Sequence, residues 1–273
     1  MNRSLVVVLA LLVSGGSGAA KAGPIADKNL EAAIRAVLHI DDKTALNDEN
    51  LNNVYILEAP GKKIASLAGL EKCKNLSLLK VTDNQISDLT PLKEAVNLQS
   101  LDLAKNKITD VAPLAGLKGL QYLELSNNQI SKVNSLSGLP AMSALYLSNN
   151  KLTDVSPLAS LTKLSSLYLD GNQVSDISLL LKVTKLSSLD LRNNKITDVA
   201  ALAKQSELRT LMIEGNKLED LAPLVAACKA DAAGDKRWAP YLRLYISMDL
   251  LGAPAKKQLV ELESVGVRLN KKE

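Results

Sequence analysis

The sequence lacks the residues on which most enzyme active sites depend. It has no phenylalanine, one histidine, two cysteines and one tryptophan among 273 residues. Because His39 is the only histidine, a Ser-His-Asp or Cys-His mechanism would have to use it. His39 lies beside Asp41 and Asp42, where a polar residue at the end of a predicted helix is the simpler interpretation. We therefore expect no catalytic residues and no enzyme.

Motifs that bind metals, phosphates or nucleic acids are also missing. The sequence contains no H-E-x-x-H, no glycine-rich phosphate loop and no zinc-ligand spacing. The acid-rich stretch 41–50 lacks the pattern of a calcium loop. The net charge is only +4 and the lysines are scattered, which argues against a nucleic-acid partner. We expect neither a metal nor a cofactor.

Only one long apolar run is present, and it is too short to cross a bilayer. Leu5–Val13 is preceded by Arg3 and followed by small residues that end in Ala20-Lys21-Ala22. This pattern predicts that residues 1–22 are a secretory signal peptide with an A-x-A cleavage site. The protein would then be secreted or periplasmic, with no membrane span in the mature chain. An uncleaved short anchor is the alternative.

The dominant positive feature is an asparagine that recurs every 22 residues. The series is Asn84, Asn106, Asn128, Asn150, Asn172, Asn194 and Asn216. Aliphatic residues keep a fixed frame around each asparagine, for example Leu98, Leu101, Leu103, Asn106 and Ile108. A period of roughly 20–29 residues with this leucine and asparagine frame is typical of a leucine-rich repeat.

Each position of the frame has a physical reason. Leu101 and Leu103 alternate with Asp102, so a short strand would point both leucines inward and the aspartate outward. One coil cannot bury its leucines, whereas stacked coils can, with their strands in one parallel sheet. The asparagine is expected to donate to and accept from the backbone of neighbouring coils.

A second phrase, [ST]-D-x-x-P-L, follows the asparagine in several coils. Ser/Thr and Asp before a proline predict the cap and first turn of a short 3₁₀ or helical segment. Some coils depart from this phrase: Lys132 replaces the aspartate, and Ser135, Leu179 and Ala201 replace the proline. We expect those coils to be less regular on the convex side.

The phrase N-x-I-S-D-L-x-P-L at 84–92 resembles the 22-residue repeat of bacterial internalins and of a eukaryotic phosphatase regulatory subunit. The resemblance covers roughly residues 25–225. It implies an α/β solenoid, a leucine-rich repeat horseshoe with a parallel β-sheet on the concave face. Short 3₁₀ or helical segments would form the convex face, with helical caps at both ends.

The ends of the chain do not fit the repeat, and we divide the sequence into four parts. Residues 1–22 are the signal peptide, 23–53 a helical N-terminal cap, and 54–225 the solenoid. Residues 226–273 form a C-terminal cap with a final irregular repeat and a terminal helix. Asp27 is expected to cap the first helix and Pro254 to open the last. Both caps would cover the apolar ends of the stack.

The two cysteines are predicted not to pair. Cys73 lies in the first coils and Cys228 in the C-terminal cap. At about 4.8 Å per coil they would be separated by more than about 30 Å. A disulfide requires Cα atoms within about 7 Å. We expect two small buried core residues, with an exposed thiol or an intermolecular bridge as the alternative.

The concave face is the predicted binding site. Its outward residues include Tyr122, Tyr146, Tyr168, Asp102, Glu124, Asp170, Asp190 and Arg192. Tyrosine is frequent in binding hot spots because it buries a large area and keeps a hydroxyl for hydrogen bonding. The surrounding carboxylates favour a basic partner. We predict a monomer that binds a protein or peptide with this face.

Two other functions remain open at this point. The chain could be a structural component of the cell envelope without a specific ligand. It could also be a hydrolase that uses only carboxylates, for example Asp102 with Glu124. Their setting on an open, wet face argues against strongly shifted pKa values, and so against the hydrolase.

Overall fold

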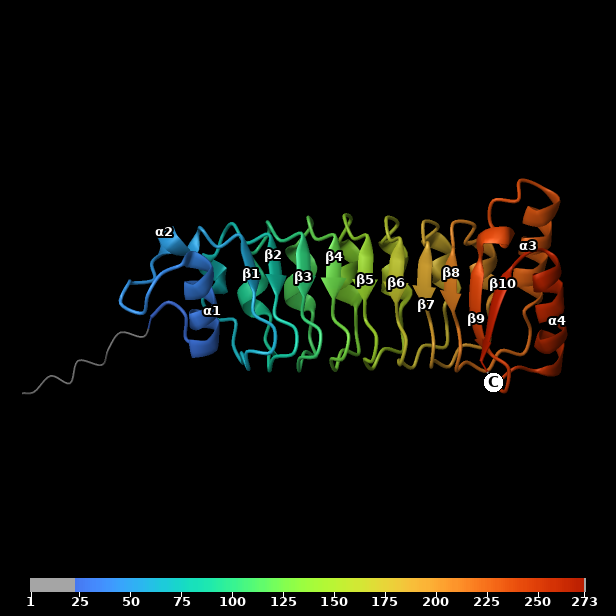
Figure 1. Ribbon diagram of the computed structural model, residues 1–273, viewed down its shortest axis with the longest axis horizontal. Coiled ribbons are helices and arrows are strands. Elements are labelled where there is room, and N and C mark those ends of the chain that lie inside the picture. The colour runs from blue at the N-terminus through green and yellow to red at the C-terminus, as the bar shows by residue number, and fades with distance from the viewer. Residues whose placement is uncertain (1–22, 273) are drawn as a thin grey trace, which may run out of the picture.

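Ten short parallel strands, hydrogen-bonded in chain order, form one face of the protein (Figure 1). The structure is a computed structural model and describes residues 23–272. The strands are β1 Ile56–Glu58, β2 Leu78–Lys80, β3 Ser100–Asp102, β4 Tyr122–Glu124, β5 Ala144–Tyr146, β6 Ser166–Tyr168, β7 Ser188–Asp190, β8 Thr210–Met212, β9 Arg243–Ser247 and β10 Arg268–Lys272. From β1 to β8 each residue pairs with the residue 22 positions later, as Leu101 does with Leu123. This register confirms the predicted leucine-rich repeat solenoid.

Short 3₁₀ helices lie behind the sheet, on the convex side (Figure 1). They are η1 Leu70–Lys72, η2 Thr90–Leu92, η3 Ala112–Gly116, η4 Asn134–Gly138, η5 Ser156–Ser160, η6 Ser178–Lys182 and η7 Ala200–Lys204. The N-cap residue of η3 is Val111, and the predicted contribution of the aspartate comes from one residue earlier: Asp110 Oδ1 accepts a hydrogen bond of 2.8 Å from the N–H of Ala112, the first residue of η3.

The expectation of irregular convex segments was wrong. The coils without the aspartate or the proline form η4, η6 and η7. Each of these helices is five residues long, the same length as η3 and η5. The inward leucine and one backbone bond are enough to hold the turn. In η4, Leu136 is fully buried and its N–H donates to the Val133 carbonyl at 3.0 Å. Proline and aspartate therefore assist this turn without determining it.

The seven asparagines form a hydrogen-bonded ladder along the edge where the strands end. Asn150 Nδ2 donates to the carbonyls of Leu125 and Leu147, both at 3.0 Å. Its Oδ1 accepts from the N–H of Ile130 at 2.9 Å. One amide thus satisfies backbone groups of its own coil and of the preceding coil, as predicted. The same contacts recur from Asn84 to Asn216.

The residue before each ladder asparagine has a left-handed backbone. At Gly171 φ is +66°, and a Cβ there would lie 2.3 Å from Asn149 Oδ1 in the preceding coil. Gly215 has the same conformation and the same conflict with Asn193. Glycine is favoured at these two positions because a Cβ would require the asparagine side chain of the preceding coil to move, although Lys105 and Asn127 adopt the same left-handed backbone at equivalent positions.

The N-terminal cap consists of α1 Lys28–Leu38 and α2 Asp48–Leu51. Asp27 caps α1 as predicted, accepting from the N–H groups of Asn29 at 2.9 Å and Leu30 at 3.1 Å. Its second oxygen accepts from the N–H of Ala65 at 2.7 Å, which ties the helix to the first coil. The apolar side of α1 is buried against the end of the stack through Leu30 and Ile34.

The C-terminal end combines two helices with the last two strands. Helix α3 spans Ala222–Ala233, so it takes the place that a 3₁₀ helix has in the preceding coils. The short helix η8 Ala239–Tyr241 leads into β9, and α4 Ala253–Ser264 leads into β10. Helix α4 covers this end of the solenoid beside α3 (Figure 1). The edge strand β10 carries charged residues such as Lys271 and Lys272, which disfavour pairing with another sheet.

Both cysteines are buried and unpaired, as predicted. Burial raises the pKa of the Cys73 thiol to about 11 and that of Cys228 to about 12. Within residues 23–272, no helix has the length and apolar character to cross a membrane. The predicted signal peptide, residues 1–22, lies outside the described residues.

The first prediction tests the asparagine ladder. Asn150→Ala should lower the free energy of unfolding by about 1–3 kcal/mol, because buried backbone groups of two coils lose their partner. The control is Gln129→Ala, an exposed amide on the same edge, which should change stability by less than about 0.5 kcal/mol. Chemical denaturation measures both. Equal stability of the two variants would disprove the structural role of the ladder.

Candidate functional site on the concave sheet face

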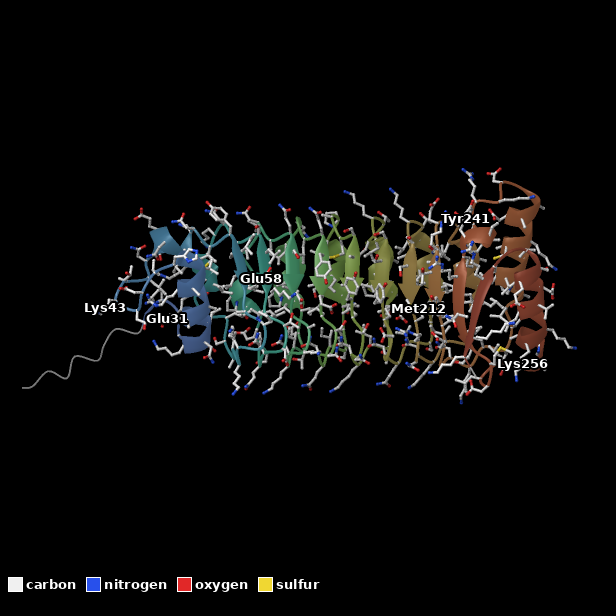
Figure 2. All side chains as sticks on the ribbon, in the orientation of Figure 1. Glu31, Lys43, Glu58, Met212, Tyr241 and Lys256 are labelled. Atoms are coloured by element: carbon white, nitrogen blue, oxygen red, sulfur yellow. The ribbon has the colours of Figure 1, made fainter. Side chains whose placement is uncertain are left out.

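The outward side chains of the strands form regular rows across the sheet. One row follows the strand register through Lys80, Asp102, Glu124, Tyr146, Tyr168, Asp190 and Met212. A neighbouring row contains Tyr122, Ala144, Ser166 and Ser188. Figure 2 labels Glu58 in β1 and Met212 in β8, and side chains stand on the sheet face toward the viewer between them. The leucines between them point into the core.

Three tyrosines are in contact in the middle of this face, as predicted. The rings of Tyr146 and Tyr168 are stacked, with centroids 4.8 Å apart and planes inclined by 24°. Tyr122 lies against Tyr146 at 5.4 Å. Burial, with the charge of Glu124 next to it, raises the pKa of Tyr122 to about 12. The cluster is therefore a half-buried aromatic strip and not three freely rotating rings.

Small residues surround the aromatic strip. Ala144 and Ser166 lie beside the tyrosines in the neighbouring row, and Ser126 and Ser148 lie on the other side. The hydroxyl of Tyr168 is 3.0 Å from Ser188 Oγ, which orients this ring. The sequence did not single out Ser188 or Ser148. Ser188 pairs with Ser166 and so lies diagonally from Tyr168 across the two strands, and this placement is the sequence signal for the contact.

Three carboxylates next to the tyrosines have no ion-pair partner. Asp102, Glu124 and Asp170 form no ion pair within residues 23–272. Glu124 Oε1 accepts from the N–H of Ser126 at 2.7 Å, and Asp170 accepts from the Ser148 hydroxyl. This face is thus acidic although the whole chain has a net charge of +4.

The expected wet environment of Glu124 needs correction. Burial raises the pKa of Glu124, against the opposing effect of its hydrogen bonds with Ser126, and the nearby charges of Asp102 and Asp170 add to the rise. Tyr146 lies opposite this carboxylate in the next strand, and Tyr122 precedes it by two residues on the same face of β4, so both rings help to shield it from water. Sequence alternation showed that Glu124 points outward but could not show how much the tyrosines cover it.

Asp190 also differs from the expectation. It belongs to the outward row, yet its side chain is 0 % exposed. Arg192 folds back over it, with Nε 2.9 Å from Oδ1 and Nη2 2.5 Å from Oδ2. The hydrogen bond to Asp190 raises the pKa of Arg192. Glu214 approaches the same guanidinium at 4.0 Å. The pair is a structural part of the face, and Asp190 cannot contact a partner directly.

Among the described residues, no group of three or more His, Cys, Asp and Glu side chains could hold a metal ion. The available groups are aromatic rings, hydroxyls and carboxylates on an exposed sheet. Such a surface can bind a partner through contact area and charge.

The comparisons with known proteins support the repeat assignment. A family profile described as "Leucine rich repeat" matches residues 96–152, and one described as "Leucine Rich repeats (2 copies)" matches 143–182 and 184–226. No curated protein matches the chain.

Several solved structures share the fold. Internalin C2 from Listeria monocytogenes is 34% identical, with a TM-score of 0.71 over 72% of this chain and 88% of that one. Internalin F from the same organism is 25% identical, with a TM-score of 0.50 and 92% coverage of both chains. The ectodomain of a plant receptor kinase from Arabidopsis thaliana, solved in complex with Casparian strip integrity factor 2, is 22% identical. Its TM-score is 0.61 over 76% of this chain and 26% of that one, which shows a shared fold.

A second prediction concerns the Asp190–Arg192 pair. Arg192→Met should destabilise the protein by about 3–5 kcal/mol, because it leaves a buried carboxylate without its cation. Adding Asp190→Asn should restore much of the loss, since the buried charge is then gone. A double-mutant cycle by chemical denaturation measures this coupling. Additive effects of the two substitutions would contradict it.

A third prediction follows from the pKa of Glu124. A carboxyl group whose pKa is raised by folding stabilises the fold only while it is protonated, and this contribution is lost as the pH rises through the folded-state pKa. Glu124→Gln, which stays neutral, should therefore be more stable than the parent at pH 7. The two proteins should have equal stability below the unfolded pKa of about 4.3. A stability difference that does not depend on pH would refute this explanation.

Proposed function

Because this chain belongs to the leucine-rich repeat proteins of the internalin type, we propose that it is a binding module whose concave face holds a protein or peptide partner. The repeat assigns the inward residues to the scaffold and leaves the outward rows free to vary. The observation that carries the proposal is the stacked strip of Tyr122, Tyr146 and Tyr168 on the exposed sheet.

The aromatic strip has the properties of an interface centre. It presents ring surface that is already ordered by stacking and by the Tyr168–Ser188 contact. Ordering before binding reduces the entropy that association costs. Tyrosine clusters of this kind dominate binding energy at many interfaces. Small neighbours such as Ser166 on one side and Ser148 on the other leave both sides of the strip open to a partner.

The charge of the face favours a basic partner. Asp102, Glu124 and Asp170 lie around the tyrosines without a cation, whereas Asp190 is neutralised by Arg192. A lysine or arginine of the partner beside the rings would supply the missing charge and could also contact an aromatic face. Electrostatic complementarity of this kind raises the association rate and fixes the register of the complex.

We also propose that the protein acts outside the cytoplasm, as a monomer. The pattern of residues 1–22 supports export, and the internalin relatives are consistent with it. The charged edge strand β10 and helix α1, which packs against the edge strand β1 at the other end, support a monomer because both disfavour pairing with another sheet.

The fourth prediction tests the concave site. Tyr146→Ala/Tyr168→Ala should weaken binding of the partner captured by the parent protein by about 2 kcal/mol or more. The matched control is Tyr55→Ala/Tyr241→Ala, which removes two exposed rings outside the concave strip. A biosensor titration of both variants gives the two dissociation constants.

The outcome separates the binding module from a structural envelope component. Loss of binding only in the Tyr146/Tyr168 variant supports the concave site. Unchanged affinity in that variant excludes the concave site. Failure of the parent to capture any partner from envelope or extracellular fractions would favour the structural component.

A further inference from the structure

The edge at which the strands end has a charge pattern that the concave site does not use. We propose that this edge binds a linear anionic polysaccharide, with one negative charge per disaccharide, along the axis of the solenoid. We call it the turn edge and define it as two rows that flank the asparagine ladder. One row is Gln85, Lys107, Gln129, Lys151, Gln173, Lys195 and Lys217, and the other is Asp83, Lys105, Asn127, Asn149, Gly171, Asn193 and Gly215. Figure 2 shows nitrogen-tipped side chains along this edge, at the bottom of the view.

The first row alternates glutamine and lysine from coil to coil, from Gln85 to Lys195. Its spacing is fixed by the backbone, because each residue donates its N–H to the preceding coil. Lys151 donates to the Ile130 carbonyl and Lys195 to that of Val174, both at 2.8 Å. Coils about 4.8 Å apart therefore place a lysine about every 10 Å along this row. An extended disaccharide has about this length.

The lysines of the turn edge are free to bind an anion. From position 105 to 217 the two rows hold five lysines and no carboxylate. None of these lysines forms an ion pair in the described part of the chain, although Asp110, Asp154 and Asp198 follow three residues after a lysine. Those aspartates are occupied on the convex side, where each accepts a backbone N–H at 2.7–2.8 Å.

Amides between the lysines suit the hydroxyl groups of a sugar. Lys195 Nζ lies 3.3 Å from Gln173 Oε1, and Lys151 Nζ lies 3.5 Å from Gln129 Oε1, so amide and ammonium groups of successive coils are adjacent. In the second row, Asn149 Oδ1 lies close to Gly171. Because Gly171 has no side chain, nothing projects from the edge at this position. Amide and ammonium groups together can bind both the hydroxyls and the carboxylate or sulfate of a repeating unit.

Other anionic partners fit this edge less well. A protein interface has an apolar or aromatic centre, and the two rows contain no apolar side chain. For the same reason they offer nothing to insert into a membrane. A nucleic-acid strand carries a phosphate about every 3.4 Å, three times denser than these lysines, and its bases usually stack on aromatic rings that the edge lacks.

The fifth prediction tests this site with a fluorescent hyaluronan decasaccharide, which has one carboxylate per disaccharide. Lys107→Gln/Lys151→Gln/Lys195→Gln should weaken binding about fivefold or more at low salt, since it removes three exposed ion pairs with the carboxylates of the sugar. The matched control, Lys74→Gln/Lys163→Gln/Lys185→Gln, removes three exposed lysines from the opposite edge and should change affinity less than about twofold. Fluorescence anisotropy measures both.

Two further measurements make the result specific. Pentaglutamate that is acetylated at its N-terminus and amidated at its C-terminus, with the same five carboxylates at a different spacing, should bind more weakly than the decasaccharide. The Tyr146→Ala/Tyr168→Ala variant should bind the decasaccharide like the parent, so this test is independent of the concave site. The proposal is overturned if the parent does not bind the decasaccharide, if both lysine triples weaken binding equally, or if pentaglutamate binds as well.

Discussion

The register of one coil upon the next is the constraint on which the rest of the structure depends. It is held from inside by leucines such as Leu101 and Leu123, which pair in adjacent strands and are fully buried. At the edge it is held by the asparagine ladder, in which Asn150 bonds to backbone groups of two coils. The leucines supply most of the free energy, but hydrophobic contact has no direction. The amide bonds supply direction and prevent one coil from sliding over another.

This constraint turns the sequence period into straight rows on the surface. A residue type that recurs every 22 positions becomes a column of equal groups about 4.8 Å apart. The chain separates its charges in this way. Carboxylates such as Glu124 and Asp170 lie on the concave face, lysines such as Lys151 lie on the turn edge, and Asp154 lies on the convex side. The small net charge of +4 therefore results from an acidic concave face and a basic turn edge whose charges largely cancel.

The period also determines how far the sequence alone could lead. The strands, the inward leucines and the Tyr146–Tyr168 contact all follow from position in the frame, and each was predicted. Features that depend on the rotamer of a side chain were not predicted. Alternation places Asp190 outward, but a rotamer of Arg192 buries it. The regular turn at η4 was missed for another reason: the buried Leu136 holds it without the proline that marks such turns in the sequence.

Comparison between coils supports the proposal that the acidic residues near the tyrosines bind a cationic partner. Asp190 and Glu124 occupy the same row of the sheet, and each accepts the N–H of the residue two positions later. In the coil of Asp190 that residue is Arg192, which neutralises the buried charge. In the coil of Glu124 it is Ser126, which has no charge and cannot neutralise the carboxylate. A half-buried carboxylate without a cation costs stability, and its raised pKa expresses that cost. Arg192 shows that the repeat can hold a cation at the position two residues after the outward carboxylate. A scaffold role alone does not explain why Glu124 lacks one beside the aromatic strip, whereas a cationic partner would.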